Sequence, residues 1–340
     1  MSAPQNVVIV SSAHWHGDPR LNRHLEYLEA GGHDATFVSH SDRPRIVAMA
    51  RALTSIVRKR SDLVVLPDPE LFFIGSLFAR LRGSKPVIDI HEDYPQAAMA
   101  RAWVPGWARP LVRLIASIAV QLGRIAGAHV LVAAPELAHP GDTIVLNIPN
   151  PASMPMRAHD GSRRLVYVGD VTVARGAITM VEALSHLNDT FTLQIIGRVS
   201  PSAAGEIESS ARRLGVLDRI SLSGQLEHDE AWRSAGGALA GLNLLSPAPA
   251  YLGAVATKLW EYMSVGLPVI VSDLPGQARL VTTIHPDLVC RTPAEVAGVA
   301  IRLAEDPALR DSLAAAGRRL AETKWIESRP DLAVQSLVEP

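Results

Sequence analysis

Residues 257–273 read Thr-Lys-Leu-Trp-Glu-Tyr-Met-Ser-Val-Gly-Leu-Pro-Val-Ile-Val-Ser-Asp. Apolar residues at helical spacing predict a helix over 257–265, Gly266 and Pro268 predict its end, and the β-branched run 269–271 predicts a buried strand. A helix that ends on glycine and leads into such a strand is typical of a parallel α/β sheet. Ligands of these sheets bind beyond the carboxyl ends of the strands. Glu261 is therefore either a ligand-binding carboxylate or a glutamate on a solvated helix face.

The wording Lys-Leu-Trp-Glu-Tyr-Met-Ser-Val-Gly-Leu-Pro-Val-Ile at 258–270 resembles the donor-nucleotide segment of GT-B glycosyltransferases, most closely glycosyltransferase family 4. In that family the glutamate at this place holds the ribose hydroxyls of a sugar nucleotide, and the resemblance implies this role for Glu261. It also implies a retaining transfer, commonly described as a front-face displacement in which the departing phosphate takes the acceptor proton. No metal and no cofactor besides the nucleoside-diphosphate sugar is then expected.

Length and composition indicate a folded chain of about two domains. It has 340 residues, of which 48% are hydrophobic and 20% charged, with a net charge of −1. This balance excludes disorder and gives no general attraction to nucleic acid. A single cysteine, Cys290, excludes an internal disulfide framework and fits a reducing compartment. The start lacks the pattern of a secretory signal and the apolar region 111–134 is too interrupted to span a bilayer, so we expect a cytoplasmic protein.

Strands alternate with helices along the first 150 residues, which predicts a doubly wound parallel sheet. One helix is expected to begin at Pro19 after the N-cap Asp18 and to end at Gly31-Gly32. The other helices are expected at 46–57, 69–81 and 107–126. The strands are expected at 7–10, 35–38, 63–66, 87–90, 129–133 and 143–146.

The alternation restarts after a proline-rich segment, and this predicts a second domain of the same kind. The domains are placed at 1–150 and 165–322, with the linker at 151–164. Strands are expected at 165–168, 193–196, 220–222, 241–245 and 267–271, and helices at 176–187, 201–214, 228–235, 257–265, 276–283, 294–304 and 308–322. The resemblance implies the GT-B layout, with two Rossmann-like domains facing each other across a cleft. It also implies that residues 323–340 form a final helix that crosses back to the acceptor-side first domain.

A strand, a loop and a helix start at 166–176 suit a bound diphosphate. Arg175 would lie beside free backbone N–H groups at a helix N-terminus, flanked by Gly169 and Gly176. The segment resembles the family's strand–loop–(Lys/Arg)-Gly sequence, which implies that Arg175 neutralises the leaving diphosphate. Family members often carry an arginine after the strand glycine, but Asp170 stands there. Arg198 at the next strand end is the candidate to replace that cation, and the alternative is a solvated loop arginine.

The loop before the helix lacks one carboxylate that the family often has. The first of two spaced glutamates would fall on Gly253, where backbone could approach sugar or phosphate oxygens closely. Lys258 is a further candidate for a phosphate contact, although a lysine at such a position is more often a surface residue.

In the first domain His91 follows the strand 87–90 and is followed by Glu92 and Asp93. A histidine after a strand is usually an ordinary core or loop residue. The position matches the family's strand-end histidine, which implies contact between His91 and the donor sugar near the reacting carbon. Glu92 and Asp93 are candidates for acceptor contact or for simple capping.

The first loop contains the cluster His14-Trp15-His16 where many family members have paired glycines. Trp15 is suited to stack on an acceptor ring, and His14 or His16 to hydrogen-bond it. Two histidines without nearby cysteine or carboxylate ligands are a weak metal signal, and no Asp-X-Asp triplet occurs in the chain. We therefore expect acceptor contact and no metal.

Between Asp93 and Glu136 the chain has no acidic residue but several arginines, together with Trp103 and Trp107. The pattern favours ordinary solvated helix faces. Weak peripheral contact with anionic membranes is the alternative.

The combined pattern predicts a retaining glycosyltransferase that acts on a small-molecule or lipid-linked acceptor in glycoconjugate, natural-product or cell-surface biosynthesis. Two alternatives stay open. One is a sugar-nucleotide epimerase of the same fold, and the other is a catalytically silent GT-B subunit that binds a partner enzyme, which the departures at Asp170 and Gly253 allow.

Overall fold

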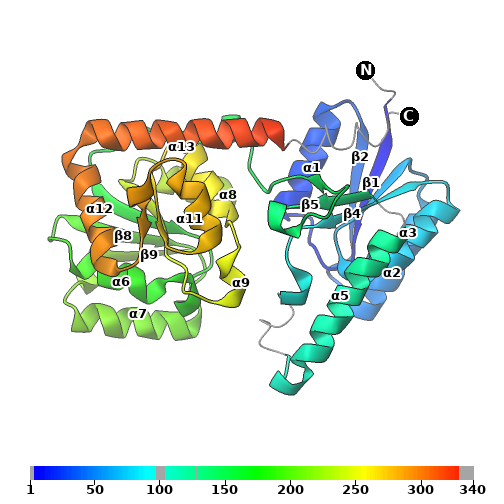
Figure 1. Cartoon of the computed structure of the whole chain (residues 1–340), viewed down its shortest axis with the longest axis horizontal. Coiled ribbons are helices and arrows are strands. Elements are labelled where there is room, and N and C mark those ends of the chain that lie inside the picture. The colour runs from blue at the N-terminus through cyan, green and yellow to red at the C-terminus, as the bar shows by residue number, and fades with distance from the viewer. Residues whose placement is uncertain (1–3, 97–103, 127–128, 329–340) are drawn as a thin grey trace. The chain divides into compact units, whose positions relative to one another are not determined.

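The computed structural model of the chain describes residues 4–96, 104–126 and 129–328. These residues form two compact units (Figure 1). The first extends to Asn147 and the chain returns to it at Glu327, while the second spans Ile148–Ile326. The linker prediction was wrong at its end, because Arg163 and Arg164 already belong to a strand.

The first unit is built on a six-stranded parallel sheet with strand order β2-β1-β3-β4-β5-β6. Two of its predicted helices start later than expected, because short 3₁₀ turns at Pro69–Leu71 and Gly106–Ala108 precede them. Its elements are β1 (Asn6–Ser11), α1 (Pro19–Ala30), β2 (Asp34–Ser39), α2 (Arg45–Arg58), β3 (Leu63–Leu66), α3 (Phe72–Leu81), β4 (Lys85–Ile90), α5 (Arg109–Ile125), β5 (His129–Val132) and β6 (Thr143–Ile144).

Both faces of this sheet are buried, which explains why its strands are almost continuously apolar in sequence. Alternate side chains of each strand, such as Val8 and Val10, pack with α2, α3 and α5 in one cluster. The intervening side chains, such as Val7 and Ile9, pack with α1 in another cluster. The polar carboxyl ends of β1, β3 and β4 therefore emerge together at one edge of the sheet.

The second unit contains another six-stranded parallel sheet, with strand order β12-β11-β10-β7-β8-β9. Helix α6 contacts both α7 and α12 (Figure 1). The elements are β7 (Arg163–Val168), α6 (Ala177–Ser185), β8 (Phe191–Ile196), α7 (Pro201–Arg213), β9 (Ile220–Gly224), α8 (His228–Ala235), β10 (Ala240–Asn243), α9 (Pro249–Leu252), α10 (Thr257–Ser264), β11 (Val269–Ser272), α11 (Pro275–Thr282), β12 (Val289–Cys290), α12 (Pro293–Glu305) and α13 (Pro307–Glu327).

The last helix differs from its prediction. Helix α13 runs without a break from Pro307 to Glu327, so the boundary placed between 322 and 323 was wrong. It packs on the second unit, where Gly317 lies against Met263 and the Arg318 side chain donates to the Ser264 carbonyl oxygen. The rest of the segment predicted to cross back, 329–340, lies outside the described residues. No described helix is both long and apolar enough to cross a membrane.

Candidate functional site

Tyr262 anchors helix α10 to the second sheet. Its ring is fully buried, and its hydroxyl accepts a hydrogen bond from the Val168 N–H at 2.8 Å. Gly241 on β10 makes room for the ring, since a Cβ there would lie 2.4 Å from it. The helix is thereby held against β7 and β10, and this determines where its neighbouring residues Glu261 and Lys258 lie.

Glu261 is a buried carboxylate. The residue is 8% exposed, and its Oε1 lies 3.0 Å from Nε2 of His228 at the start of α8. This hydrogen bond raises the pKa of His228. The alternative of a solvated helix face was therefore wrong for Glu261, and His228 is a site residue that the sequence analysis missed.

The ammonium of Lys258 is enclosed. Its Nζ is buried without a hydrogen-bond partner and lies 3.7 Å from the centroid of the Tyr167 ring. A Cβ at Gly169 would lie 2.9 Å from the same nitrogen. Burial, reinforced by the positive charge of Arg175, lowers the pKa of Lys258 to about 7. The prediction that Lys258 is more often a surface residue was wrong.

Arg175 ends a 3₁₀ turn, Val173–Arg175, whose N-cap Thr172 accepts from the Arg175 N–H. Its Nη1 donates to the Asp170 carbonyl oxygen at 3.3 Å. The next residue, Gly176, has φ of +87°, and a Cβ there would lie 2.0 Å from the Leu244 carbonyl oxygen. Only glycine fits this left-handed, crowded position, from which α6 starts without a side-chain cap. The Arg175-Gly176 pair therefore belongs to one rigid turn at the strand end.

Asp170 and Arg198 bind each other. Nη2 of Arg198 lies 3.0 Å from Oδ2 of Asp170, and the two side chains are 72% and 47% exposed. Arg198 was predicted to replace the cation that is missing at position 170. In the structure its charge is instead paired with Asp170 itself. Gly253 ends α9 with φ of −94°, and its N–H points to the Tyr251 carbonyl oxygen.

The first unit holds a second polar cluster, around Asp68. Its Oδ1 lies 2.7 Å from Nδ1 of His14, and its Oδ2 accepts from the Ser11 hydroxyl and the Ser12 N–H. Burial is the largest effect and opposes charge on both groups. The hydrogen bonds and the attraction between the opposite charges together outweigh it, so the pKa of His14 is raised and that of Asp68 is lowered. Asp68 is 1% exposed and was not predicted, although an aspartate two residues after the buried strand β3 was the available signal.

His91 joins this cluster from the end of β4. Its ring meets that of His14 edge to face at 4.9 Å, and its Nδ1 lies 3.1 Å from the Tyr94 hydroxyl. The Tyr94 hydroxyl also donates a hydrogen bond to the Pro67 carbonyl oxygen at 2.8 Å, so it has two partners. Burial lowers the pKa of His91. Two imidazoles thus lie together, His14 favouring the charged form and His91 the neutral one.

The other predicted first-unit residues are more peripheral. Trp15 is 65% exposed with its ring against Gly17, and His16 packs on Phe37 at 5.1 Å. Oδ1 of Asp93 accepts from the Gln96 N–H, which is a capping contact, and Glu92 is half-buried. Within the part of the chain that is described, no three His, Cys, Asp or Glu side chains are grouped as metal ligands would be.

A buried ion pair holds the strand end that carries His91. Nε and Nη2 of Arg20 donate to the two carboxylate oxygens of Asp89 at 2.8 and 2.5 Å, and both residues are almost inaccessible. The pair lowers the Asp89 pKa far below its usual range in spite of burial. The sequence analysis missed it, although an aspartate inside the apolar run 87–90 signals a buried partner.

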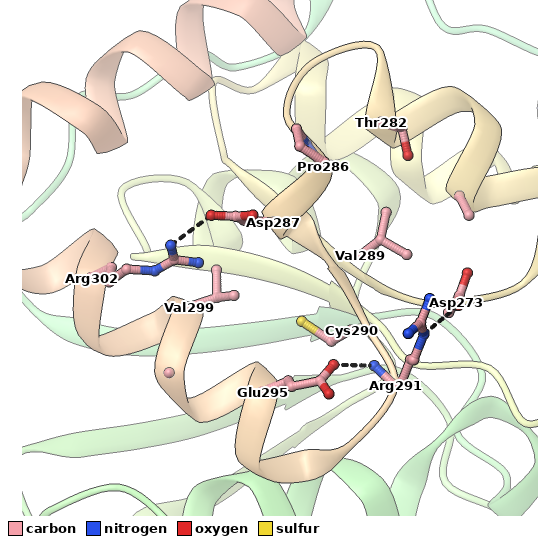
Figure 2. Close-up of a pocket in the computed structure, with 12 residues that line it drawn as sticks. Asp273, Thr282, Pro286, Asp287, Val289, Cys290, Arg291, Glu295, Val299 and Arg302 are labelled. Carbon is pink, nitrogen blue, oxygen red and sulfur yellow. Dashed lines mark hydrogen bonds and ion pairs between the residues drawn. The ribbon is translucent and has the colours of Figure 1, made fainter.

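Two hollows lie near the carboxyl ends of β10, β11 and β12. The larger, of about 790 Å³, is bordered by α11 and α12, and its arginines are paired, Arg291 with Asp273 and Arg302 with Asp287 (Figure 2). The smaller, of about 270 Å³, includes Thr179 of α6 and shares Asp273 and Arg291 with the larger one. None of the predicted site residues lines either hollow.

Two parallel six-stranded sheets in successive units, with polar clusters at their carboxyl edges, define the GT-B fold. Solved structures agree over almost the whole chain. The Thermosynechococcus elongatus sucrose-phosphate synthase has a TM-score of 0.73 at 17% identity, covering 98% of each chain. The Anabaena protein HepE, solved with UDP and glucose, has a TM-score of 0.72 at 13% identity, covering 98% of this chain and 99% of its own. A Rickettsia africae glycosyltransferase has a TM-score of 0.68 at 14% identity, covering 99% of each.

A family model matches part of the second unit. Residues 175–328 match the family described as "Glycosyl transferase-like". This stretch begins at Arg175 and includes Lys258 and Glu261. No curated protein is close enough in sequence to count as a match. The chain thus has the GT-B fold of glycosyltransferases, and its second unit carries the sequence features of a glycosyl transferase-like family.

Proposed function

We propose that the protein transfers a sugar from a nucleoside-diphosphate sugar to an acceptor. The observation that carries this proposal is the grouping of Glu261, Lys258 and Arg175 at the carboxyl edge of the second sheet. A buried carboxylate suits ribose hydroxyls, and two cations beside a helix N-terminus suit a diphosphate. The binding of UDP and glucose by HepE, a protein of the same fold, supports this donor class.

Leaving-group charge is the main physical problem of this reaction. As the glycosidic bond breaks, negative charge grows on the diphosphate, and preorganised cations stabilise it without a metal ion. Arg175, fixed by the Gly176 turn, supplies one of these charges. Glu261 orients the nucleotide, with His228 holding its carboxylate in place.

We further propose retention of anomeric configuration by the front-face route that the family 4 resemblance implies. In this route the leaving phosphate takes the acceptor proton and no carboxylate nucleophile is needed. The buried carboxylates of the first unit support this, since Asp68 is engaged by His14 and two serines, and Asp89 by Arg20. His91 is assigned to the donor sugar, and His14, Trp15, His16, Glu92 and Asp93 to the acceptor side.

A thermal-shift panel tests the donor site. Purified protein is melted with UDP, GDP, ADP, dTDP or CDP, each with and without EDTA. A nucleotide that binds only the folded state stabilises it and so raises the melting temperature. At a ligand concentration a hundredfold above Kd the stabilisation is about 3 kcal/mol. We expect one nucleotide to raise the melting temperature by an amount that EDTA does not change. This shift should be absent in the Glu261→Gln variant and present in the control variant Glu206→Gln, which lies on exposed α7.

No shift with any base would refute the donor site and favour a silent subunit. A shift that survives Glu261→Gln would refute the role of that carboxylate alone. The anomeric configuration of the product, read by proton NMR from the coupling at the transferred sugar, tests retention.

We also propose that the first unit rests on an anionic membrane and that the acceptor is lipid-linked, with the protein in the reducing cytoplasm that its single unpaired Cys290 suits. Helices α3 and α5 lie in contact (Figure 1), and the apolar side chains that they expose make up the proposed membrane face. Neither helix contains an acidic residue, and Arg109 and Arg113 are exposed. The face consists of Phe73, Ile74, Leu77, Leu81, Leu111, Leu114, Ile115, Ile118, Leu122 and Ile125, all 37–75% exposed. Trp107 is 84% exposed just before α5, and Trp103 lies outside the described residues.

Membrane binding of such a surface is favoured by burial of its apolar side chains and by attraction of its arginines to anionic lipids. Flotation with phosphatidylglycerol vesicles should recover the protein, and with phosphatidylcholine vesicles much less. The double variant Ile115→Glu, Ile118→Glu should abolish flotation, whereas Leu222→Glu on exposed β9 should not. Equal flotation of all three proteins would show that this face is not the membrane contact.

A further inference from the structure

The ammonium of Lys258 is the least satisfied charged group of the donor site. Nζ has no hydrogen-bond partner, and its surface is almost completely covered by protein. A cation in this setting loses its hydration without gaining an ion pair, which is costly unless a ligand supplies the missing anion.

The groups around Lys258 favour a ligand anion over a protein partner. Tyr167 of β7 offers only its ring face, at 3.7 Å from Nζ. Arg175 from the turn before α6 repels Lys258, and the negative charges of Glu261 and Asp170 act on it only at a distance. Glu261 is hydrogen-bonded to His228, and Asp170 to Arg198. Two cations, Arg175 and Lys258, are therefore left beside the same strand end.

The backbone next to Lys258 leaves space for this ligand. Gly169 has φ of +123° and carries no side chain between Lys258 and the end of β7. The following position, where a second cation would be expected, holds Asp170, whose side chain is turned to Arg198. Lys258 thus supplies, from α10, a charge that the strand end itself lacks.

We propose that Lys258 is the second cation of the diphosphate site and that a bound diphosphate draws a proton onto its amine. This inference rests on the proposed donor site and adds to it a coupling between nucleotide binding and pH. In the free protein, burial and the nearby Arg175 lower the pKa of the amine to about 7, so it is about half-protonated at pH 7. A dianionic ligand reverses the local field, so the amine is charged in the complex.

The linkage has a definite sign. A complex that binds more protons than the free protein weakens as pH rises. The dissociation constant should increase about fivefold between pH 7 and pH 8 and by up to about tenfold per unit above that. Proton uptake should be close to one per site at pH 8, where the free protein holds few protons on Lys258, and should be small at pH 6.

Isothermal titration calorimetry in two buffers of different ionisation enthalpy measures this uptake. The probes are UDP and, as a ligand without a base, inorganic pyrophosphate. Lys258→Met keeps the length of the side chain without the amine, and Lys59→Met on the first unit is the matched control. We expect Lys258→Met to weaken binding 10- to 100-fold and to abolish both the uptake and the rise of Kd with pH, and Lys59→Met to change none of these.

The outcomes separate the inference from the function. If wild type binds UDP or pyrophosphate and Lys258→Met binds equally well with the same proton uptake, Lys258 is not the second cation. If the variant binds more weakly but takes up the same proton, another group is protonated and the proposed coupling is wrong. If neither probe binds wild type, the donor site itself fails. Melting curves of the ligand-free variant show that it is folded.

Discussion

Replacing Tyr262 by phenylalanine should destabilise the second unit through a single hydrogen bond. The hydroxyl accepts from the Val168 N–H at 2.8 Å and lies 3.4 Å from the Val166 and Leu242 carbonyl oxygens. The ring itself is unaffected, so its edge-to-face contact with Trp232 at 5.2 Å persists. The change therefore removes polar partners from a buried part of the sheet without creating a large cavity.

The magnitude follows from the buried N–H that loses its acceptor. An unsatisfied buried donor costs about 1–3 kcal/mol. For a domain of this size each kcal/mol lowers the melting temperature by about 2–4 °C, so we expect a decrease of about 2–12 °C. Since Val168 leads directly into Gly169, against which Lys258 lies, nucleotide affinity should fall as well.

Differential scanning fluorimetry and urea unfolding check this prediction. The urea midpoint should fall with no change in slope, because the unfolded state exposes the same surface. A melting temperature within 1 °C of wild type would contradict the reasoning, because it would mean that the Val168 N–H finds another partner and that the hydroxyl does not hold α10 on the sheet.

Three further predictions concern the turn, the acceptor-side pair and the buried lysine. Gly176→Ala should lower the stability by more than about 3 kcal/mol in a melting experiment, because the position combines φ of +87° with a Cβ contact at 2.0 Å. The control Gly161→Ala has φ of +82° but nothing within 4 Å of the added Cβ, and should lower the stability by only about 1 kcal/mol. Equal losses would show that crowding by Leu244 is unimportant. Asp68→Asn should lower the His14 pKa in an NMR titration. Because the folded pKa of His14 is raised and that of Asp68 lowered, the stability lost should be greatest between about pH 4 and pH 6.5, diminishing as pH rises through the His14 pKa or falls through that of Asp68; an unchanged His14 titration would refute the pairing. Lys258→Met should raise the melting temperature of the ligand-free protein. A lysine with a folded-state pKa of about 7 destabilises the folded state fully below pH 7 and not at all above its unfolded pKa. The gain in melting temperature should therefore vanish toward pH 10, and a gain that does not depend on pH would contradict this origin.

Much of the fold was predictable because parallel strands and their covering helices leave local signals. The Asp18-Pro19 start and the Gly31 end of α1 were confirmed, as were β3 at Leu63–Leu66 and α8 at His228–Ala235. The predictions failed where the signal was short or ambiguous. The two-residue strand β12 and the single turn of α9 were missed, and the break within α13 was wrong, because nothing in its sequence ends the helix at 322.

The candidate site divides in a similar way. Glu261 and the Arg175-Gly176 turn were recognisable from contiguous residues, since each belongs to one helix start or one strand end. The burial of Lys258 was not, because it depends on Tyr167 and Gly169, which are about ninety residues away in the chain. Arg198 was expected to be free for phosphate, and only the fold directs it to Asp170.

The sequence by itself determined the order of strands and helices, the two successive α/β units and the strand ends at which polar residues occur. These properties depend on apolar periodicity, caps and glycines, all of which act within a few residues. Tertiary structure alone decided which polar groups meet: His14 with Asp68, Arg20 with Asp89, and Glu261 with His228. Each of these pairs joins residues 33 to 69 positions apart and forms only when neighbouring strands and helices are packed, because burial is what makes an unpaired charge costly and a specific partner necessary.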